Sequence, residues 1–541
     1  MPVATARRRL SRGRGSSGWL AGYKAVHLTG PFLGFNSYQS PDTIPQGLGK
    51  SGVIQTPDSL NMYSYPLGSM TSFPGHVNIN SPAANASKAL TGFGYLGEIS
   101  QRLLVAVQGK VGYDDAGVWT ELTGSPTITD DDDNFMDVDF LNNVAVLTFL
   151  KKDAPLKVAT PYTATATLGG SPRSGVKGCC AWDGRMWLIS DQNADYSARN
   201  DPETYDLTDD TLNFLTTTGA GVSDGSLITS WTVVGDAIYI GKGGINAVVE
   251  HLFRIYRTGN PALPYAFERV ETGGIGPISN PATQAVGQDL VFLAKDGNVY
   301  LVRGNVFVPE GIGRNIQRTL LADYSKSRFE FASMGVLRER GLLGLSLSLT
   351  GGTTHSRVWW YDYLNSRPGT QEWEIWHNTD HVINAFGERV SSGQRQLVTG
   401  GYDGFYERHL SGDSYAGSAY TKRYTLPWLL LGDYFQVYHV LGVVVAFQTT
   451  GDLNVTLNYR TDFGQAYTSA GTFNVGGGFI LGSGILGTTA LGGKDVGLAY
   501  VTLNVAARRL QLQFTNNVIS APYNIYAAYL LVKPRYKSVG V

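Results

Sequence analysis

Short hairpins that recur along the chain constrain the fold of this protein more than any other feature of its sequence. In GQDLVFLAKDGNVYLVRG (287–304), two apolar, β-branched runs flank Lys295-Asp296-Gly297-Asn298. Asp-Gly favours a tight hairpin turn, because glycine accepts positive φ without steric cost. A single hairpin is only marginally stable in water and must pack against other strands. The chain therefore has to supply further hairpins.

Six more segments have the same strand-turn-strand pattern. They are ISQRLLVAVQGKVGY (99–113), FLNNVAVLTFL (140–150), AWDGRMWLIS (181–190), WTVVGDAIYIGKGG (231–244), LRERGLLGLSLSL (337–349) and TGGYDGFYERHL (399–410). If the first strand of each unit is centred near residues 103, 144, 186, 237, 290, 342 and 396, successive units lie 41 to 54 residues apart. A repeat of that length made of short strands is typical of propeller blades. The alternative is a set of unrelated hairpins in a sandwich.

We therefore predict an all-β protein: a β-propeller of six or seven blades with an extended N-terminal arm and a C-terminal β-sandwich. The predicted boundaries are 1–90 for the Pro- and Gly-rich arm, 91–420 for the propeller and 421–541 for the sandwich. Alternating segments such as LNVTLNYR and RLQLQFTN indicate the sandwich strands. Within 313–327, apolar residues at helical spacing predict one short helix, with Asn315 as its N-cap.

Charged residues make up only 16% of the chain, and the formal net charge is −1. The low charge leads us to expect broad contacts with other subunits, and the net charge gives no general case for binding nucleic acid. No run approaches the ~20 apolar residues of a membrane helix, so we expect no stable membrane insertion. The neighbours Cys179 and Cys180 fit small buried residues of a protein made in a reducing compartment.

The first residues carry five arginines before any acid. We interpret this basic stretch as an arm for an acidic partner or for DNA phosphates; a disordered tail and an organellar transit peptide are the alternatives. The arginines are Arg7, Arg8, Arg9, Arg12 and Arg14.

Two glycine-containing motifs match enzyme patterns only by chance in our interpretation. GLGKSG (47–52) lies in a Pro-rich arm without a βαβ unit, and Ile44 stands where a P-loop needs its first glycine. GVSDG (221–225) resembles a nucleophile elbow, but Ser223 lies in a polar loop leading into a strand rather than on a strand-to-helix turn.

An acidic loop and two histidines are the remaining candidates for chemistry. In TDDDDNFMDVD (129–139), Asp130, Asp132 and Asn134 hold the first EF-hand positions, but Phe135 and Leu141 replace the required Gly and Glu. We expect the loop Asp130 to Asp133 to be solvated, and whether it binds a cation stays open.

His377 and His381 lack the HExxH context of a zinc site, and we expect them to be hydrogen-bonded surface residues. No acid repeats at one blade position, as a glycosidase centre requires. We therefore predict no catalytic, cofactor-binding or metal site, and a protein that is not an enzyme.

Several segments of the sequence also resemble those of a known family. FNSYQSPDTIPQGLGKSG and TPDSLNMYSYPLGSMTSFPG (within 35–75), GCCAWDGRMWLISDQNADYSARNDPETYD (178–206) and 270–305 with 313–331 resemble the β-propeller tail hub or nozzle proteins of short-tailed, podovirus-type bacteriophages. The sandwich ending LLVKPRYK is also similar. The resemblance spans most of the chain and does not distinguish hub from nozzle.

The resemblance implies a structural protein of the virion, assembled in the host bacterial cytoplasm. Its subunits would form a homo-oligomeric ring, expected to be a hexamer, around the channel that retains double-stranded DNA and then releases it during ejection. Partners would be the adaptor proteins near the portal and the tail fibres or spikes. The Gly-rich segment 476–493 and the arm are our candidate gate and seam elements.

Two other classes of function stay open at this point. A carbohydrate-binding propeller for host-surface recognition would need exposed aromatic residues on several blades, and a glycosidase would need opposed carboxylates. The candidate aromatic residues are Trp182, Trp187, Trp231, Trp359, Trp360, Trp373 and Trp376.

Overall fold

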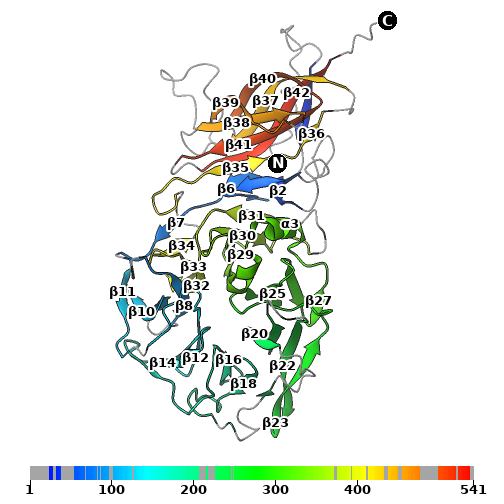
Figure 1. Cartoon of the computed structure of the whole chain (residues 1–541). Coiled ribbons are helices and arrows are strands. Elements are labelled where there is room, and N and C mark those ends of the chain that lie inside the picture. Colours follow the sequence, from blue (N-terminus) through cyan, green and yellow to red (C-terminus); the bar gives the residue numbers. More distant parts are fainter. Residues whose placement is uncertain are drawn as a thin grey trace.

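Seven four-stranded antiparallel sheets form the lower body of the protein in the computed structural model (Figure 1). The structure describes residues 23–28, 32–37, 54–67, 69–81, 83–85, 87–96, 102–124, 127–205, 207, 215–216, 226–244, 247, 249–368, 370, 374–391, 393–409, 412, 414–431, 436–448, 454–462, 464–475, 497–518 and 522–535. The first strand of each sheet contacts the first strands of the two neighbouring sheets, and the last contacts the first. The sheets therefore close a ring, and the chain is a seven-bladed β-propeller.

Six of the seven blades are each built from one continuous stretch of sequence. Their strands run outward from the ring centre in chain order. Blade 1 holds β8 (Leu90–Tyr95), β9 (Leu103–Val107), β10 (Lys110–Asp115) and β11 (Val118–Glu121). Blade 2 holds β12 (Met136–Leu141), β13 (Val144–Phe149), β14 (Leu156–Ala159) and β15 (Thr165–Thr167). Blade 3 holds β16 (Gly178–Trp182), β17 (Arg185–Ile189), β18 (Asn193–Tyr196) and β19 (Leu215–Thr216).

The next three blades follow the same plan. Blade 4 holds β20 (Leu227–Val234), β21 (Ala237–Gly243), β22 (His251–Asn260) and β23 (Leu263–Val270). Blade 5 holds β24 (Thr283–Val286), β25 (Asp289–Leu293), β26 (Val299–Arg303) and β27 (Val306–Val308). Blade 6 holds β28 (Ser333–Leu337), β29 (Leu342–Leu347), β30 (Arg357–Asp362) and β31 (Trp376–Thr379).

Blade 7 is different because its outermost strand comes from the arm. Its inner strands are β32 (Ala385–Ser391), β33 (Gln394–Gly400) and β34 (Tyr406–His409), and β7 (His76–Asn78) completes the sheet. β7 pairs antiparallel with β34, placing His76 opposite His409. The ring is therefore closed by a strand that precedes the first blade in sequence.

The predicted hairpins are present in the blades, but their strands hold different positions from those predicted. Each strand that the sequence analysis placed first in its unit is the second strand of a blade, from β9 to β33. These second strands are the most apolar, because both of their faces lie between neighbouring sheets. The inner strands that precede them carry small and polar residues. At Gly178, for example, a Cβ would lie 1.8 Å from the ring of Trp231 on the next blade.

Two six-stranded sheets pack together above the propeller to form the predicted sandwich. One sheet contains β40 (Gly497–Ala507), β37 (Tyr438–Gln448), β42 (Asn524–Pro534), β6 (Met70–Ser72), β5 (Met62–Tyr63) and β1 (Lys24–Leu28). The other contains β39 (Thr468–Asn474), β38 (Asn454–Thr461), β41 (Arg509–Asn516), β35 (Lys422–Thr425), β36 (Leu429–Leu430) and β4 (Asp58–Leu60). Val443, Leu457 and Leu512 are among the buried residues that the two sheets share.

The arm therefore belongs to both bodies. β1, β4, β5 and β6 extend the sandwich and β7 extends the propeller, while β2 (Phe32–Phe35) pairs in parallel with β3 (Ile54–Thr56) where the two bodies meet (Figure 1). Phe35 packs edge-on against Trp359 of blade 6, with ring centroids 4.9 Å apart. The arm is a built-in part of the fold.

One helix, α3 (Arg314–Asp323), and the 3₁₀ helix η3 (Lys326–Phe331) connect blades 5 and 6. The predicted helix is confirmed, and Ile316 and Leu320 are buried. Its predicted N-cap is wrong: Gly313 is the N-cap, and Asn315 lies within the helix. The Asn315 side chain is fully buried and donates to the carbonyl of Glu374, so a long-range hydrogen bond replaced the local cap. Among the described residues, no helix is long and apolar enough to cross a membrane.

Candidate functional site

The seven inner strands of the propeller enclose a central channel. It has a volume of about 320 Å³ and is lined by residues of all seven inner strands. This volume lies at the lower end of the range of small-ligand sites, about 300–1,000 Å³. The lining mixes backbone and polar groups, including those of Lys177, Asn280 and Gln284. A small polar molecule or an ion fits here, whereas a large substrate does not.

Two carboxylates of one inner strand, Asp137 and Asp139 on β12, line the channel. Asp137 accepts hydrogen bonds from the indole N–H of Trp231 (2.6 Å) and from the backbone N–H of Cys179 (3.0 Å). Asp139 accepts one from the backbone N–H of Ala181 (2.7 Å). These bonds bridge blade 2 to blades 3 and 4. The carboxylates therefore hold neighbouring blades together.

Burial raises the pKa of Asp137 to about 6, and the hydrogen bonds from Trp231 and Cys179 oppose that rise. Burial likewise raises the pKa of Asp139. The two residues are two positions apart on the same strand, so they stand side by side on one wall. A glycosidase requires two carboxylates that flank the scissile bond. This pair does not have that arrangement.

An ion pair joins the loop that enters blade 2 to η3, which precedes blade 6. The two terminal nitrogens of Arg328 donate to the two carboxylate oxygens of Asp133 at 2.6 and 2.7 Å. Burial raises the pKa of Asp133, although the hydrogen bonds from Arg328 oppose that rise. Burial acts to lower the pKa of Arg328, but the hydrogen bonds to Asp133 and its negative charge outweigh burial and raise that pKa. With contacts this short, the pair holds both groups charged.

The prediction that the loop Asp130 to Asp133 is solvated is wrong at Asp133, whereas Asp130 is exposed and Asp131 and Asp132 are partly exposed. Asp133 is buried, and Asn134 is buried with its side-chain amide donating to Asp153 at 2.7 Å. Asp130 and Asp131 pair with Lys88 and Lys151. Of the three EF-hand positions, Asp130 pairs with Lys88 and the Asn134 side-chain oxygen accepts from the backbone N–H of Lys151. The loop therefore uses these oxygens to join neighbouring parts of the propeller.

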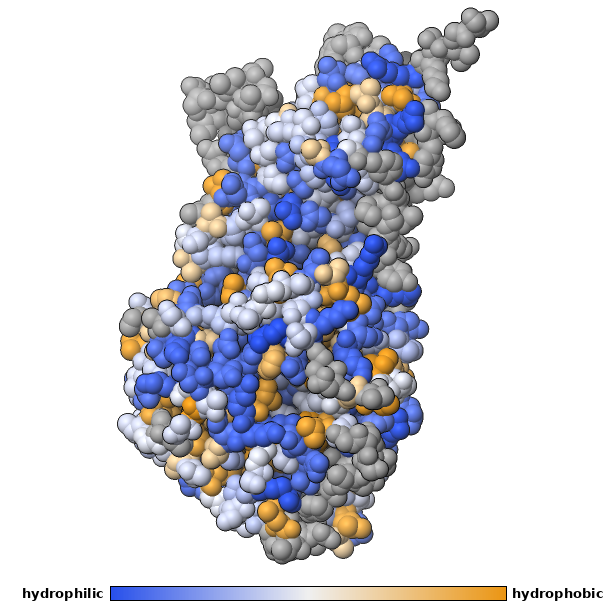
Figure 2. Space-filling model, viewed as in Figure 1, coloured by the Kyte–Doolittle hydropathy of each residue, from blue (hydrophilic) through white to orange (hydrophobic). Residues whose placement is uncertain are grey.

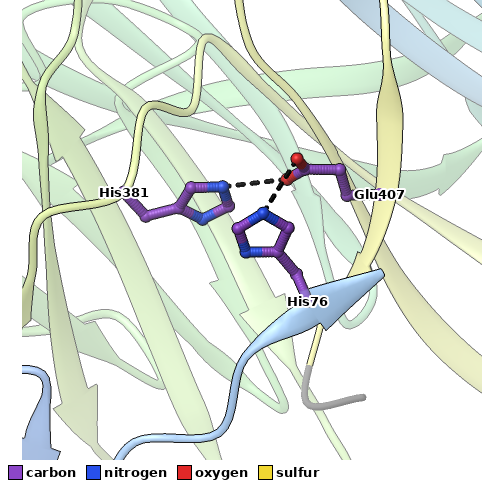
Figure 3. Close-up of side chains that lie close together, drawn as sticks. All are labelled: His76, His381 and Glu407. Atoms are coloured by element: carbon purple, nitrogen blue, oxygen red, sulfur yellow. Dashed lines mark ion pairs between the residues drawn. The ribbon is translucent and has the colours of Figure 1, made fainter. Parts of the chain in front are cut away.

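A second cluster of titratable groups lies at the closure of the ring (Figure 3). His76 begins β7, Glu407 lies on β34, and His381 lies in the segment after β31. The Nε2 atoms of His76 and His381 lie 3.0 and 2.8 Å from the two carboxylate oxygens of Glu407. The two imidazole rings stack with centroids 4.0 Å apart. Each ring therefore directs one nitrogen at the same carboxylate.

Two more rings enclose this cluster. His409, opposite His76 in the strand pair, has its ring 4.9 Å from that of His381, and Tyr415 has its ring 4.7 Å from that of His76. All three histidines are more than nine-tenths buried. Hydrogen bonds from His381 and His76 hold the pKa of Glu407 below its usual value, although burial acts to raise it. Burial lowers the pKa of His409 and of His76, in the latter case against the hydrogen bond to Glu407.

The expectation that His377 and His381 are surface residues is wrong. Both are buried. His377 lies within β31, and burial lowers its pKa to about 3. His381 was found by the sequence analysis without its partners, since Glu407 and His76 are remote in sequence and no motif connects them. The pairing of β7 with β34 brings His76 to Glu407, and the segment after β31 adds His381.

Other sequence candidates have plain outcomes. Cys179 and Cys180 are buried free thiols on β16, as expected, and burial raises the pKa of each. Six of the seven candidate tryptophans are buried core residues: Trp182, Trp187, Trp231, Trp359, Trp360 and Trp376. Five predictions fall outside the described residues: the basic stretch with Arg7, Arg8, Arg9, Arg12 and Arg14, the GLGKSG motif (47–52), Ser223 with its motif (221–225), Trp373 and the loop 476–493.

No family model and no curated protein matches the sequence. Solved structures with which the chain shares a likeness include YCF48 from Cyanidioschyzon merolae (10% identity, 62% of this chain and 98% of that chain, TM-score 0.38). They also include virginiamycin B lyase from Staphylococcus aureus (10%, 62% and 97%, 0.37) and the WD40 repeats of RRP9 (11%, 63% and 99%, 0.37). At such scores these likenesses say nothing of activity, and the propeller assignment stands on the ring of seven sheets.

Proposed function

We propose that this chain is a structural protein of a short bacteriophage tail, in the hub or nozzle position. Copies of it form a ring around the DNA channel, and the ring retains the genome and then lets it pass. The role is suggested by the resemblance of residues 35–75, 178–206 and 270–331 to that family. The fold is compatible with this role. The observation that carries the proposal is the set of contacts by which the arm joins the propeller to the sandwich.

The two bodies of the chain are braced at several points by the arm. The backbone N–H of Asn61 donates to the carbonyl of Asn378 in β31 (2.8 Å), while the Asn61 side chain donates to the carbonyl of Thr421, next to β35 (2.7 Å). Nearby, Tyr415 donates to the Asn61 side-chain oxygen (2.7 Å). A subunit joined in this way resists hinging between propeller and sandwich, which a ring that holds pressurised DNA requires.

The propeller's own channel is unsuited to DNA. Its volume is about 320 Å³. The major groove of B-DNA alone is about 12 Å wide, so a duplex cannot enter such a space. A DNA path would therefore run between the subunits of a ring.

The outer rim of the propeller offers contact surfaces for such a ring. β23 and β27 are the outermost strands of blades 4 and 5, and they carry Leu263 and Val306, which are 60% and 66% exposed. On the face shown in Figure 2, apolar residues are otherwise dispersed among polar ones. An unpaired strand edge with exposed apolar side chains is a surface that another chain can cover.

The proposal is tested by the oligomeric state of the purified chain. We expect mass photometry and negative-stain images to show closed rings with a central hole, formed alone or after mixing with the adaptor proteins of the same tail. Leu263→Asp with Val306→Asp should reduce ring formation, whereas Leu364→Asp, at a similarly exposed turn of blade 6, should not. A chain that stays monomeric with every tail partner would contradict the proposal.

A carbohydrate-binding propeller is less well supported, because six of the seven tryptophans that it would use are buried in the blades. A glycan array run with the same preparations separates the two functions. Strong binding of one glycan class by monomers would favour recognition of the host surface.

A further inference from the structure

We propose that His76, His381 and Glu407 form a structural site for a divalent transition-metal ion of the zinc class, located where the propeller ring closes. The three residues come from three separate segments: β7 of the arm, the turn between blades 6 and 7, and β34. One ligand atom of each lies within 4.8 Å of the others. The proposal concerns the stability of the fold and is independent of the function proposed above.

The distances suit a single ion between the groups. Zinc binds imidazole nitrogen and carboxylate oxygen at about 2.0–2.2 Å, so two ligand atoms at right-angled to tetrahedral spacing lie about 3 Å apart. The two Nε2 atoms lie 3.0 and 2.8 Å from the two oxygens of Glu407. Both rings therefore already hold a nitrogen at ligand spacing from the carboxylate (Figure 3).

The chemistry of the donor set favours the same ions. Neutral imidazole nitrogens with one carboxylate suit zinc and its first-row neighbours, whereas calcium and magnesium prefer oxygen ligands alone. When an ion is bound, the ring protons of His76 and His381 move from Nε2 to Nδ1, so each Nε2 lone pair can serve as a ligand. Glu407 stays ionised and offsets half of the ion's charge.

Burial supplies a second, independent observation. His76, His381 and His409 are 4%, 6% and 7% exposed, and four of their six ring nitrogens have no hydrogen-bond partner among the described residues. Buried polar atoms are nearly always satisfied by protein, water or an ion. His409 has both ring nitrogens unpartnered and its ring lies 4.9 Å from that of His381, so it borders the three ligands without being one of them.

The other grouping of possible ligands differs in these respects. Asp131, Asp132 and Asp133 also lie close together, but Lys151 and Arg328 already neutralise two of them. The histidine cluster has no lysine or arginine in its ion pairs. An ion there would connect the arm to two blades and act as a clasp on the closed ring.

The test begins with the full-length wild-type chain. After exposure to zinc and gel filtration, we expect one zinc ion per chain by elemental analysis, and a melting temperature that rises with zinc and falls with a chelator. Replacing zinc by cobalt should give a visible absorption spectrum of nitrogen and oxygen ligation. Wild-type chain that retains no metal, and whose melting temperature ignores both zinc and chelator, would overturn the proposal.

Variants then locate the ion. Glu407→Gln and His381→Asn should each lose the bound zinc and the response of the melting temperature to zinc. His439→Gln, a partly exposed histidine of the sandwich, and Asp131→Asn should keep both. If a cluster variant fails to fold, the cobalt spectrum of the wild type still distinguishes imidazole from all-oxygen ligation. Zinc retained by both cluster variants and lost from Asp131→Asn would also refute the assignment.

Discussion

Blades 1 to 6 and the closing region of the molecule are assembled in opposite ways. Each of the first six blades pairs strands that follow one another directly in sequence. In blade 7 and in the sandwich, strands near residues 24–78 pair with strands hundreds of residues later, such as β7 with β34 and β1 with β42. The same four-stranded sheet is thus reached by local hairpins in one region and by distant pairing in the other.

The difference teaches where the stability of the fold is concentrated. A local hairpin closes a short loop and has little chain entropy to overcome, whereas a distant pair depends on the rest of the chain being in place. Damage to one blade should therefore stay moderate. Damage to the closing contacts should affect both bodies at once.

Removal of residues 1–80 should have the largest effect, because it deletes the strands that pair with distant parts of the chain. It deletes β1 to β7, which contribute strands to both sandwich sheets and to the closing blade and which include the whole β2–β3 sheet. We expect loss of cooperative unfolding and of near-ultraviolet circular dichroism. Removal of residues 1–22 deletes no described strand and serves as the control, with a melting temperature close to that of the full chain. Normal melting of the 1–80 deletion would show that the arm is dispensable.

The ion pair that crosses the ring should have the next largest effect. Asp133→Ala leaves the partly buried Arg328 without its partner. Breaking a fully buried pair costs about 3–5 kcal/mol, and because Arg328 is partly exposed we expect a loss of about 2–3 kcal/mol. The measurement is urea denaturation at neutral pH. The exposed pair Lys110–Glu121 within blade 1 is the matched control, and Glu121→Ala there should cost less than about 1 kcal/mol. Equal losses would remove the distinction between ring-crossing and local contacts.

A buried carboxylate inside blade 4 should make the stability of the fold depend on pH, as a local effect to set against the ring-crossing contact. Glu250 accepts one hydrogen bond from Gly276, and burial raises its pKa from 4.5 to about 7. Between these values the folded chain binds more protons than the unfolded chain, so stability falls as pH rises. Glu250→Gln should therefore stabilise the chain above pH 7 by at most about 3 kcal/mol, an advantage that vanishes below pH 4.5.

Denaturation of wild type and variant at pH 4, 6 and 8 measures that difference. Asp236→Asn, which alters an exposed carboxylate of the same blade, controls for general charge effects. A constant difference at all three pH values would show that Glu250 does not titrate in this range.

The smallest effect is expected at a single turn within blade 2. Asn142 and Asn143 join β12 to β13 with φ of 50° and 63°, as a two-residue hairpin turn with left-handed backbone requires. Asn143→Val should cost about 1–2 kcal/mol, because a β-branched residue resists this conformation. Asn143→Gly should be nearly neutral. Thermal melting compares the two, and equal behaviour would show that turn strain does not matter here.

Much of the propeller is readable from the sequence because its signals are local. Asn142-Asn143 and Asp183-Gly184 have the positive φ values that their residue types favour. The analysis nevertheless took the second strand of each blade for the first, because apolar strands between sheets stand out and inner strands such as β12 do not. β7 could not be predicted: HVN is too short to show a period, and its partner lies over 300 residues away.

The candidate sites were hidden for the same reason. Asp137 and Asp139 read as the end of an acidic loop until β12 places them in the channel. Asp133 looked solvated because Arg328 is 195 residues away. The histidine cluster draws on residues 76, 381, 407 and 409, which no spacing rule connects. Each of these sites depends on contacts between residues far apart in the sequence, and a single sequence does not show such contacts.

The position of β7 has a consequence for synthesis on the ribosome. This strand is translated before the first blade, yet its partner β34 ends at His409. At about 5–20 residues per second, roughly 15 to 70 seconds separate the two events. Throughout that interval the ring of blades cannot close, and β7 has no partner strand. It can then pair wrongly with another nascent chain on the same messenger. Closely spaced ribosomes on one messenger should therefore lower the yield of folded chain.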